Sequence, residues 1–244
     1  MSPDPERWLL VSDVDDTLLG DDEALVKLTA ALQAVRARLV LAYNSSRPCA
    51  SLRRSLLEHP LLPQPDYLIG ALGTEIEQGK DGPAFEACTR RLAAEWRRET
   101  IAALMERLGF EAHADEFQTP LKASYHVPGD DQHQYVLEQL DHRGVRVKVI
   151  FSGGKNLDII PFGAGKGNAA DYLRNMLDFS PERVVVAGDS GNDREMFILP
   201  FKGIVVANAA TELKALSDWR IYHAQASHAA GVLEGLQHWG VLES

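Results

Sequence analysis

Three aspartates, Asp13, Asp15 and Asp16, directly follow an apolar run from Trp8 to Ser12. Like charges at this spacing repel one another, and a carboxylate beside a buried strand is costly to desolvate. A divalent cation would neutralise this crowding, and oxygen ligands of this kind suit Mg²⁺. A carboxylate can also attack phosphorus to form an aspartyl-phosphate, while a neighbouring acid protonates the leaving oxygen and later deprotonates water.

Further polar groups stand where strands are predicted to end or a helix to begin. The segment Asn-Ser-Ser-Arg at 44–47 follows one predicted strand, GDSGND at 188–193 follows another, and Lys166 opens a helix. Ligands of an open parallel sheet bind beyond the carboxyl ends of its strands, so these groups are expected to converge. Asp13 and Asp189 are then the natural pair of metal ligands, and a lysine and a hydroxyl would hold the phosphoryl oxygens.

Both ends of the chain alternate short apolar segments with amphipathic ones. This alternation predicts an α/β fold, a parallel sheet with helices on both faces. The predicted strands are 8–12, 39–43, 67–71, 184–187 and 203–206. The predicted helices are 24–36, 49–57, 166–177, 193–199, 211–217 and 229–239.

The pattern changes after GKDGP at 79–83 and resumes at Gly165. The intervening segment predicts one long helix over 89–108, a second helix near 134–142, and strands over 122–127, 145–151 and 157–160. Such a mixture suits a small α+β insert. We therefore predict a catalytic core of residues 1–81 and 163–244, with an inserted cap domain of residues 82–162.

The polar groups together resemble the four motifs of the haloacid dehalogenase (HAD) superfamily of phosphohydrolases, in order. The matching residues are DVDDT at 13–17, Ser45, Lys166 and GDSGND at 188–193. The position of the insert, between the second and third motifs, resembles members with a C2-type cap. The resemblance implies a Rossmann-like core with a parallel sheet, an α+β C2-type cap, and Mg²⁺ as the cofactor.

The resemblance also implies roles for single residues. It makes Asp13 the nucleophile and a metal ligand, and Asp15 the general acid/base, with its backbone carbonyl on the metal. Ser45 and Lys166 would bind the phosphoryl group.

Two further aspartates belong to the implied metal site. Asp189 would bind the metal, and Asp193 would hold a metal-bound water or Lys166. Asp16 and Thr17 are expected to have only a turn and helix-start role.

Longer segments resemble the sucrose-phosphatase-like branch of the superfamily. They are AYNSSRP at 42–48, PDYLIGALGTEI at 65–76, KASYHV at 122–127, VIFSGGKNLDIIP at 149–161 and YHAQASHAAGVLEGL at 222–236. Such proteins remove the phosphate group from the fructose unit of a disaccharide phosphate. Sucrose 6-phosphate is the usual substrate, and mannosylfructose phosphate is a close relative. The resemblance thus implies a small-molecule sugar phosphate as the partner.

The cap is expected to supply the sugar contacts, because polar side chains at strand ends and turns can read hydroxyl groups. The candidates are Lys122, His126, Lys155 and Asp158. The alternative is that these lysines are solvated and Asp158 is a turn residue.

The core contributes three further candidates for substrate binding. Glu75 would touch sugar or cap a turn. Arg47 would contact the substrate or pair with an acid. Asn192 is expected to shape its loop and to line the substrate site.

One residue departs from the family pattern. Ser46 stands where the second motif usually has a glycine, and a serine is unfavourable there if the position needs a positive φ. Asn44 and Arg194 are closer to the mannosylfructose-phosphatase pattern, which leaves the disaccharide open.

Three other functions compete with a disaccharide-phosphate phosphohydrolase. The first is a phosphatase for another sugar or polyol phosphate. The second is a sugar phosphomutase, which no second phosphate pocket supports. The third is a catalytically silent domain that binds a glycosyltransferase, which the presence of both Asp13 and Asp15 disfavours.

The composition narrows the class of partner. The formal net charge of −10 argues against nucleic acid or an anionic membrane as the main partner. The two cysteines, Cys49 and Cys88, form no zinc-binding spacing. No signal peptide or apolar run long enough to span a membrane is apparent, so we expect a cytoplasmic protein. We expect a monomer, with association to a sucrose-phosphate-synthase-like glycosyltransferase as an open alternative.

Overall fold

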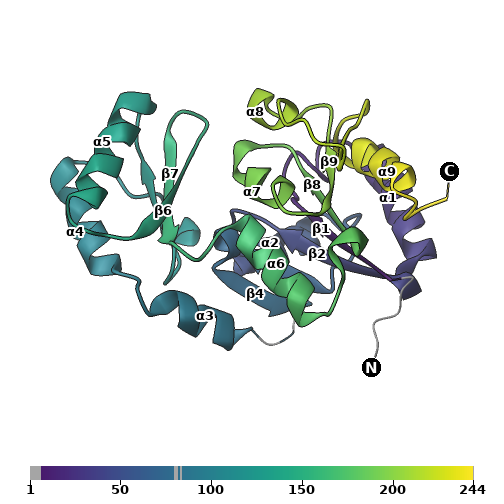
Figure 1. The fold of residues 1–244 in the computed structure, drawn as a ribbon, viewed down its shortest axis with the longest axis horizontal. Coiled ribbons are helices and arrows are strands. Elements are labelled where there is room, and N and C mark those ends of the chain that lie inside the picture. The colour runs from purple at the N-terminus through teal and green to yellow at the C-terminus, as the bar shows by residue number, and fades with distance from the viewer. Residues whose placement is uncertain (1–6, 80–81, 83, 244) are drawn as a thin grey trace.

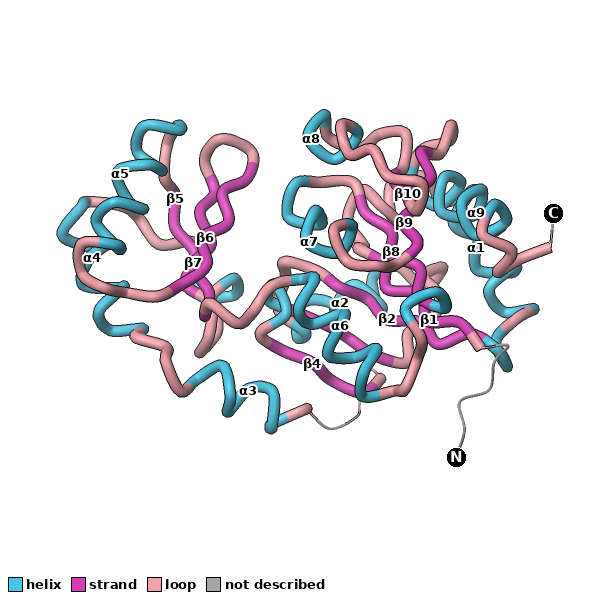
Figure 2. The backbone as a smooth tube through the Cα atoms, in the orientation of Figure 1, coloured by secondary structure: helices cyan, strands magenta, loops and turns pink. Residues whose placement is uncertain are grey.

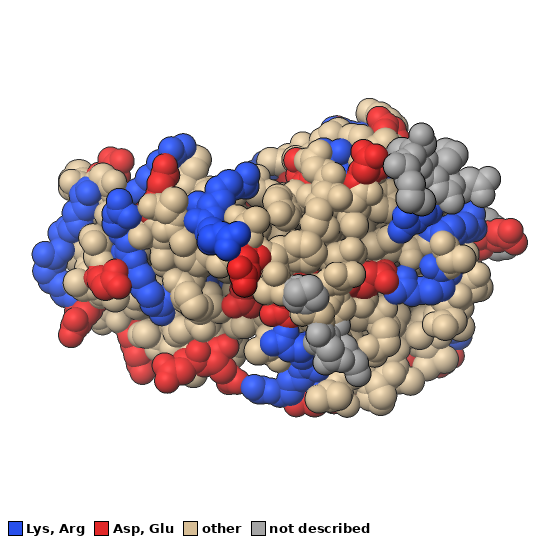
Figure 3. All heavy atoms as spheres, turned by 90° about the horizontal axis from the view of Figure 1, so that it is seen from below, with Lys and Arg blue, Asp and Glu red and all other residues tan. Residues whose placement is uncertain are grey.

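The fold is that of a computed structural model, and residues 7–79, 82 and 84–243 are described. The described chain forms two lobes, each with its own sheet (Figure 1). None of the described helices is long and apolar enough to cross a membrane. On the face seen in Figure 3, Lys and Arg side chains are interspersed with Asp and Glu side chains.

The larger lobe contains a seven-stranded sheet in the order β10-β9-β8-β1-β2-β3-β4 (Figure 2). All neighbouring strands run parallel except β3 and β4, which are antiparallel. The strands are β1 Trp8–Ser12, β2 Leu39–Asn44, β3 Tyr67–Gly70, β4 Glu75–Gln78, β8 Val184–Gly188, β9 Lys202–Val205 and β10 Ile221–His223.

The central strand β1 is completely buried, as its apolar sequence requires. It pairs with β2 on one side and β8 on the other, so that Ser12 lies beside Tyr43 and Ala187. This register brings the residues that follow these three strands to one edge of the sheet. The predicted α/β fold is confirmed in this lobe.

The helices of this lobe pack in pairs, with α1 against α9 and α6 against α7. They are α1 Asp22–Ala34, α2 Cys49–Glu58, α6 Lys166–Met176, α7 Arg194–Phe197, α8 Thr211–Lys214 and α9 His228–His238. Short 3-10 turns complete the lobe: η1 Arg36–Arg38, η2 Ala71–Gly73, η4 Pro181–Arg183 and η5 Gly191–Asp193. Both cysteines of the chain are free and buried.

The smaller lobe contains a three-stranded antiparallel sheet in the order β5-β7-β6. The strands are β5 Ala123–His126, β6 Val147–Ser152 and β7 Asn156–Pro161. The remaining elements before α6 are α3 Glu86–Ala93, α4 Arg98–Leu108, η3 Asp115–Phe117 and α5 Gly129–Asp141. α4 and α5 lie on the side of this sheet that faces away from the larger lobe (Figure 1).

The long helix predicted over 89–108 is wrong, because α3 ends at Ala93 and α4 begins at Arg98. The backbone of Arg97 is not helical, with φ −125° and ψ 59°. The indole of Trp96 donates a hydrogen bond to Pro120 O at 2.8 Å. This tertiary contact fixes the break, although the local sequence favours a continuous helix.

The short edge strands β4 and β10 were not predicted. β4 has one buried residue, Ile76, and β10 has none, so neither gives a strong apolar signal. The predicted helix over 193–199 is also shorter, since η5 precedes a one-turn α7. The proposed first domain boundary, after residue 81, adjoins residues outside the described ones, and the division at 82–162 stays a prediction.

Candidate active site

The network at the sheet edge begins with Asp13, which directly follows β1. Its backbone N–H donates to Ala187 O at 3.0 Å, which continues the pairing with β8. Its side chain is nearly buried, whereas that of Asp15 is half exposed. The intervening Val14 is fully buried, so it holds the turn against the core between the two carboxylates.

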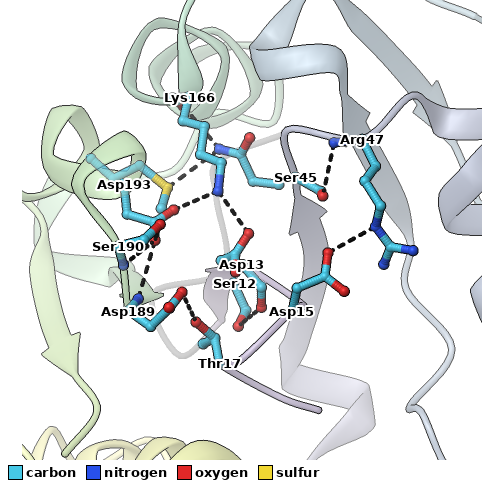
Figure 4. A network of polar contacts seen from close by, with 12 residues as sticks. Ser12, Asp13, Asp15, Thr17, Ser45, Arg47, Lys166, Asp189, Ser190 and Asp193 are labelled. Atoms are coloured by element: carbon cyan, nitrogen blue, oxygen red, sulfur yellow. Dashed lines mark hydrogen bonds and ion pairs between the residues drawn. The ribbon is translucent and has the colours of Figure 1, made fainter. Parts of the chain in front are cut away.

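Lys166 is the first residue of α6 and reaches into the same network (Figure 4). Its ammonium lies 2.7 Å from Asp13 Oδ1 and 2.6 Å from Asp193 Oδ1, and the side chain is 1% exposed. Gly165 precedes it with φ +128°, and a Cβ there would meet Glu195 Oε2 at 2.1 Å. Only glycine therefore fits at the point where the chain turns into the lysine helix.

The GDSGND segment folds back on itself so that Asp193 is fully buried. Oδ2 of Asp193 accepts hydrogen bonds from the N–H groups of Asp189 and Ser190, each at 3.1 Å. Its Oδ1 contacts Lys166. Both oxygens of Asp193 are thus engaged, and this arrangement favours the predicted contact with Lys166 over direct metal binding.

Burial dominates the electrostatics of the cluster. It raises the pKa of Asp13 well above its usual range, and Asp193 adds to the rise, although Lys166 opposes it. Burial, followed by the charge of Asp193, raises the pKa of Asp189 to about 6. For Lys166, burial lowers the pKa, but Asp13 and Asp193 outweigh it and raise the pKa above its ordinary value. In the same cluster one ammonium, that of Lys166, faces the three carboxylates of Asp13, Asp189 and Asp193.

This charge imbalance fits a divalent cation. Asp13, Asp189 and Asp193 each offer an oxygen, and these atoms all lie within 4.8 Å of one another. Oxygen ligands of this kind suit Mg²⁺. Thr17 donates from Oγ1 to Asp189 Oδ1 at 3.1 Å and orients that carboxylate.

Ser45 follows β2 at the same sheet edge. Its Oγ accepts a hydrogen bond from the N–H of Arg47 at 3.1 Å. Ser46 does not adopt a positive φ, so the expected penalty for replacing glycine does not arise. Asn44 donates from Nδ2 to Lys166 O at 2.9 Å and thereby joins β2 to the start of α6.

Arg47 and Glu75 both have partners within the protein. Nε of Arg47 lies 2.8 Å from Asp15 Oδ2, which is the predicted pairing with an acid. Glu75 Oε2 accepts from the N–H of Cys49 at 2.8 Å and caps α2. The structure thus gives Glu75 a capping contact instead of showing it free for sugar.

The sheet of the smaller lobe has two unlike faces. Ala123 and Tyr125 of β5, with Leu157 and Ile159 of β7, pack into the apolar core under its helices. Side chains alternate along a strand, so the intervening residues point to the opposite face. The strand register places Ser124, Asp158 and Ile150 in one row of that face, and His126, Asn156 and Ser152 in the next.

A buried ion pair anchors this polar face. Lys122 lies 3.1 Å from Asp158 Oδ1, and its side chain is only 4% exposed. Ser124 donates to the same oxygen at 2.5 Å. Lys122 is therefore not the solvated surface lysine of the alternative interpretation. His126 is exposed and stacks on His113, with ring centroids 3.9 Å apart.

The remaining two candidates lie apart from the network. Lys155 is exposed at the β6–β7 turn. Asn192 lines a cleft of about 350 Å³, where η5 and α7 of the larger lobe face Ile150 and Phe151 of β6. The cleft therefore lies between the lobes, beside the GDSGND segment.

Sequence reasoning missed three polar residues, Thr17, Asn156 and Lys148. Thr17 lies in a turn as expected but begins no helix, since α1 begins at Asp22, and its bond to Asp189 was not foreseen. Asn156 shares the polar face with His126. Lys148 of β6 pairs with Glu195 of α7 at 2.6 Å. Strand alternation around the predicted Asp158 was the signal that could have found Asn156.

The fold and this site define a phosphohydrolase of the HAD superfamily. A haloacid dehalogenase-like hydrolase from Bacillus subtilis superposes on this chain with a TM-score of 0.69 at 17% identity, which shows that the two share a fold. That match covers 98% of this chain and 94% of the other.

Three comparisons place the chain more narrowly. The family model for sucrose-6F-phosphate phosphohydrolase matches residues 6–240. Mannosylfructose-phosphate phosphatase from Agrobacterium fabrum is 35% identical, covering 96% of this chain and 97% of the relative. The sucrose-phosphatase of Synechocystis, solved with sucrose and phosphate, superposes with a TM-score of 0.90 at 34% identity, covering 98% of this chain and 100% of that one.

The chain belongs to the sucrose-6F-phosphate phosphohydrolase family, and it is a phosphoric monoester hydrolase. Sucrose-phosphatase 2 from Nicotiana tabacum is 32% identical, and the match covers 95% of this chain. The chain spans only 59% of the length of that plant relative.

Proposed function

We propose that the protein hydrolyses the phosphate ester of a disaccharide phosphate, with sucrose 6-phosphate as its substrate and sucrose as the product. The observation that carries the proposal is the convergence of Asp13, Asp15, Ser45 and Lys166 at one sheet edge. Beside them, Asn192 of the GDSGND segment lines a cleft to β6 of the smaller lobe. The full-length likeness to a sucrose-phosphatase that binds sucrose and phosphate supports this substrate class.

The reaction proceeds in two displacements at phosphorus. A carboxylate oxygen of Asp13 attacks, an aspartyl-phosphate forms, and Asp15 gives its proton to the departing sugar oxygen. Asp15 then removes a proton from water, and the resulting hydroxide releases phosphate from Asp13. Lys166 and Ser45 hold the phosphoryl oxygens while the negative charge on these oxygens is redistributed in the transition state.

Asp13 and Asp189 would hold Mg²⁺, together with the backbone carbonyl of Asp15. The bound ion supplies charge neutralisation for the crowded carboxylates and for the phosphoryl group. Asp193 keeps Lys166 in place through the 2.6 Å contact.

The smaller lobe acts as the cap that recognises the sugar. The polar row of His126, Asn156 and Ser152 presents donors and acceptors to hydroxyl groups, and Asn192 lines the cleft from the core side. Lys122 and Asp158 hold the middle of that face rigid through their buried pair.

Mannosylfructose phosphate is the second candidate substrate. The observation that favours it is the 35% identity, over nearly the full length of both chains, to a phosphatase named for it. Both candidates carry a phosphorylated fructose, so the same core chemistry serves either.

A substrate panel with Mg²⁺ tests the proposal by phosphate release. It contains sucrose 6-phosphate, mannosylfructose phosphate, fructose 6-phosphate, glucose 6-phosphate and p-nitrophenyl phosphate, with Asp13→Asn as the inactive control. A strong preference for one disaccharide ester supports the proposal and identifies the substrate. Equal, slow turnover of every ester would contradict the disaccharide assignment. No turnover of any ester would favour the alternative of a catalytically silent domain that binds a glycosyltransferase.

We further propose a monomer that works in the cytoplasm and associates with the sucrose-phosphate-synthase-like glycosyltransferase that makes its substrate. The two free, buried cysteines suit a reducing compartment. Gel filtration of the protein alone and with such a glycosyltransferase tests the monomer and the association separately.

A further inference from the structure

Arg47 links the proposed acid/base Asp15 to the buried face of helix α2. Its Nε lies 2.8 Å from Asp15 Oδ2, and its Nη1 donates to Ser55 Oγ at 2.7 Å. Ser55 is 3% exposed within α2, so it is a fixed anchor for the guanidinium. Figure 4 shows the Arg47 side chain reaching across to Asp15 from the loop after β2.

The backbone of Arg47 is held as firmly as its side chain. Its N–H donates to Ser45 Oγ at 3.1 Å, and its carbonyl accepts from the N–H of Ala71 at 2.7 Å. Pro48 follows it and restricts its backbone further. Arg47 therefore has a fixed position beside Asp15. Their contact is an ion pair, because neither Nε nor Nη2 of Arg47 has a hydrogen-bond partner among the described residues.

Asp15, in contrast, has little else to orient it. Its side chain is 48% exposed, against 22% for Arg47. Among the described residues, no hydrogen bond or second ion pair reaches its carboxylate. Without Arg47 this side chain would be free to rotate among its staggered conformers. Proton transfer requires the acid to stay within hydrogen-bond reach of the reacting oxygen.

We infer that Arg47 is a positioning residue, which holds Asp15 by Oδ2 so that Oδ1 exchanges the proton with the leaving oxygen and then with water. This inference rests on the proposed function. In the first displacement, an Asp13 oxygen bonds to phosphorus and the bond between phosphorus and the bridging oxygen breaks. At the same time the Oδ1–H bond of Asp15 breaks, and its proton bonds to the bridging oxygen. In the second, Oδ1 takes a proton from water, the hydroxide oxygen bonds to phosphorus, and the Asp13–phosphorus bond breaks.

The guanidinium suits this task better than an ammonium would. Its planar fork can hold Asp15 and Ser55 at the same time in a fixed geometry, whereas a lysine has a single flexible charge. Arg47→Lys is accordingly expected to recover only part of what Arg47→Gln loses.

The test compares two leaving groups. The alkoxide of a sugar needs a proton as it departs, but the nitrophenolate of p-nitrophenyl phosphate departs without one. For the sugar phosphate that the wild-type enzyme hydrolyses fastest, Arg47→Gln should lower kcat about 100-fold, the lower range of general acid catalysis. The rate constant for formation of the aspartyl-phosphate from p-nitrophenyl phosphate should remain nearly unchanged. It is measured from the pre-steady-state burst of nitrophenolate.

Two further variants separate positioning from damage to the fold. Ser55→Ala keeps the charge but removes the anchor, so it should lower kcat for the sugar phosphate in the same direction by a smaller factor. Arg220→Gln breaks an ion pair to Asp218, outside the site, which has the same 2.8 Å length and a similar exposure of its arginine. This variant should change the rate with neither substrate. Thermal unfolding of each variant reports whether the fold persists.

The outcomes are distinct. An equal rise in KM for both substrates would assign Arg47 to phosphoryl binding and overturn the inference. Unchanged turnover of the sugar phosphate in Arg47→Gln would overturn it as well. Failure of the wild-type enzyme on every disaccharide ester would overturn the proposed substrate but not this comparison, which any alkyl phosphate that it hydrolyses can carry.

Discussion

Lys166 and Asp193 form an ion pair of 2.6 Å in which both side chains are almost completely buried. Asp13 lies 2.7 Å from the same ammonium, so one lysine serves two carboxylates. A buried charge is stable only while its partners remain, because the protein has replaced its water of hydration. This arrangement makes the stability of the core depend on residues of the active site.

Asp193→Asn should therefore destabilise the protein strongly, by about 3 kcal/mol in the free energy of unfolding, the range for breaking a buried ion pair. Urea unfolding measures the change. Glu23→Gln is the matched control, since it breaks an exposed pair with Lys27 at 2.9 Å and should leave the unfolding midpoint unchanged. Equal effects of the two substitutions would show that burial of the Lys166 pair has no energetic consequence.

Removal of Mg²⁺ should abolish turnover and lower the melting temperature. A ligand present at 100 times its dissociation constant adds about 2.7 kcal/mol to the free energy of unfolding. Differential scanning fluorimetry with and without EDTA measures the shift. Asp189→Asn lacks a predicted ligand, so its melting temperature should respond far less to Mg²⁺. Full activity in excess EDTA would contradict the proposed cofactor.

The metal-free protein should lose stability as the pH rises. The pKa of Asp189 is raised from 3.8 to about 6 in the fold, so the folded state holds this proton more tightly than the unfolded state. Its contribution is full below pH 3.8 and is lost as the pH rises through about 6. The pKa of Asp13 is raised as well and acts in the same direction.

Urea unfolding in EDTA, over this pH range, measures the effect. Asp189→Asn carries no titrating group there and should show a flatter profile than the wild type. Mg²⁺ should also flatten the profile, because the cation stabilises the ionised carboxylates. Identical profiles for the two metal-free proteins would rule out Asp189 as the source.

His126→Ala should raise KM for the disaccharide phosphate with little change for p-nitrophenyl phosphate, because only the larger substrate can reach the cap face. His126 is exposed, so its loss should not disturb the fold. His142→Ala removes another exposed histidine, at the end of α5, and should change neither KM. An unchanged KM in His126→Ala would remove this residue from the sugar site.

The sequence was most informative where residue type and strand position coincide. β1, β2 and β8 are continuous apolar runs, and the residues after them were placed correctly at one sheet edge. The pairing of Lys166 with Asp193 was also among the predicted roles.

Other features depend on contacts between distant segments, which local patterns do not encode. The break between α3 and α4 follows from the bond of Trp96 to Pro120. The capping of α2 by Glu75 requires β4 to lie beside that helix. Neither Thr17 nor Asp189 indicates alone that the two side chains meet.

The strained turn at Ala71 and Leu72 provides a further link across the site. Both residues adopt positive φ, 48° and 57°, which is unfavourable for side chains with a Cβ. Leu72 N–H donates to Ser45 O at 3.1 Å, and Leu72 O accepts from Gly165 N–H at 3.0 Å. The loop after β2 and the start of α6 are thereby both bonded to the backbone of one buried residue, Leu72.

The same turn lies just before β4, after which the chain forms α3 and the smaller sheet before it returns at Gly165. The segment proposed to recognise the sugar thus lies between hydrogen-bonded neighbours, while the groups proposed to act on phosphorus, Asp13, Asp15, Ser45 and Lys166, lie outside it. In evolutionary language, selection for a new sugar can act on one continuous stretch of the gene and leave the hydrolytic machinery untouched. Divergence among relatives of this kind is therefore expected to concentrate between β4 and α6.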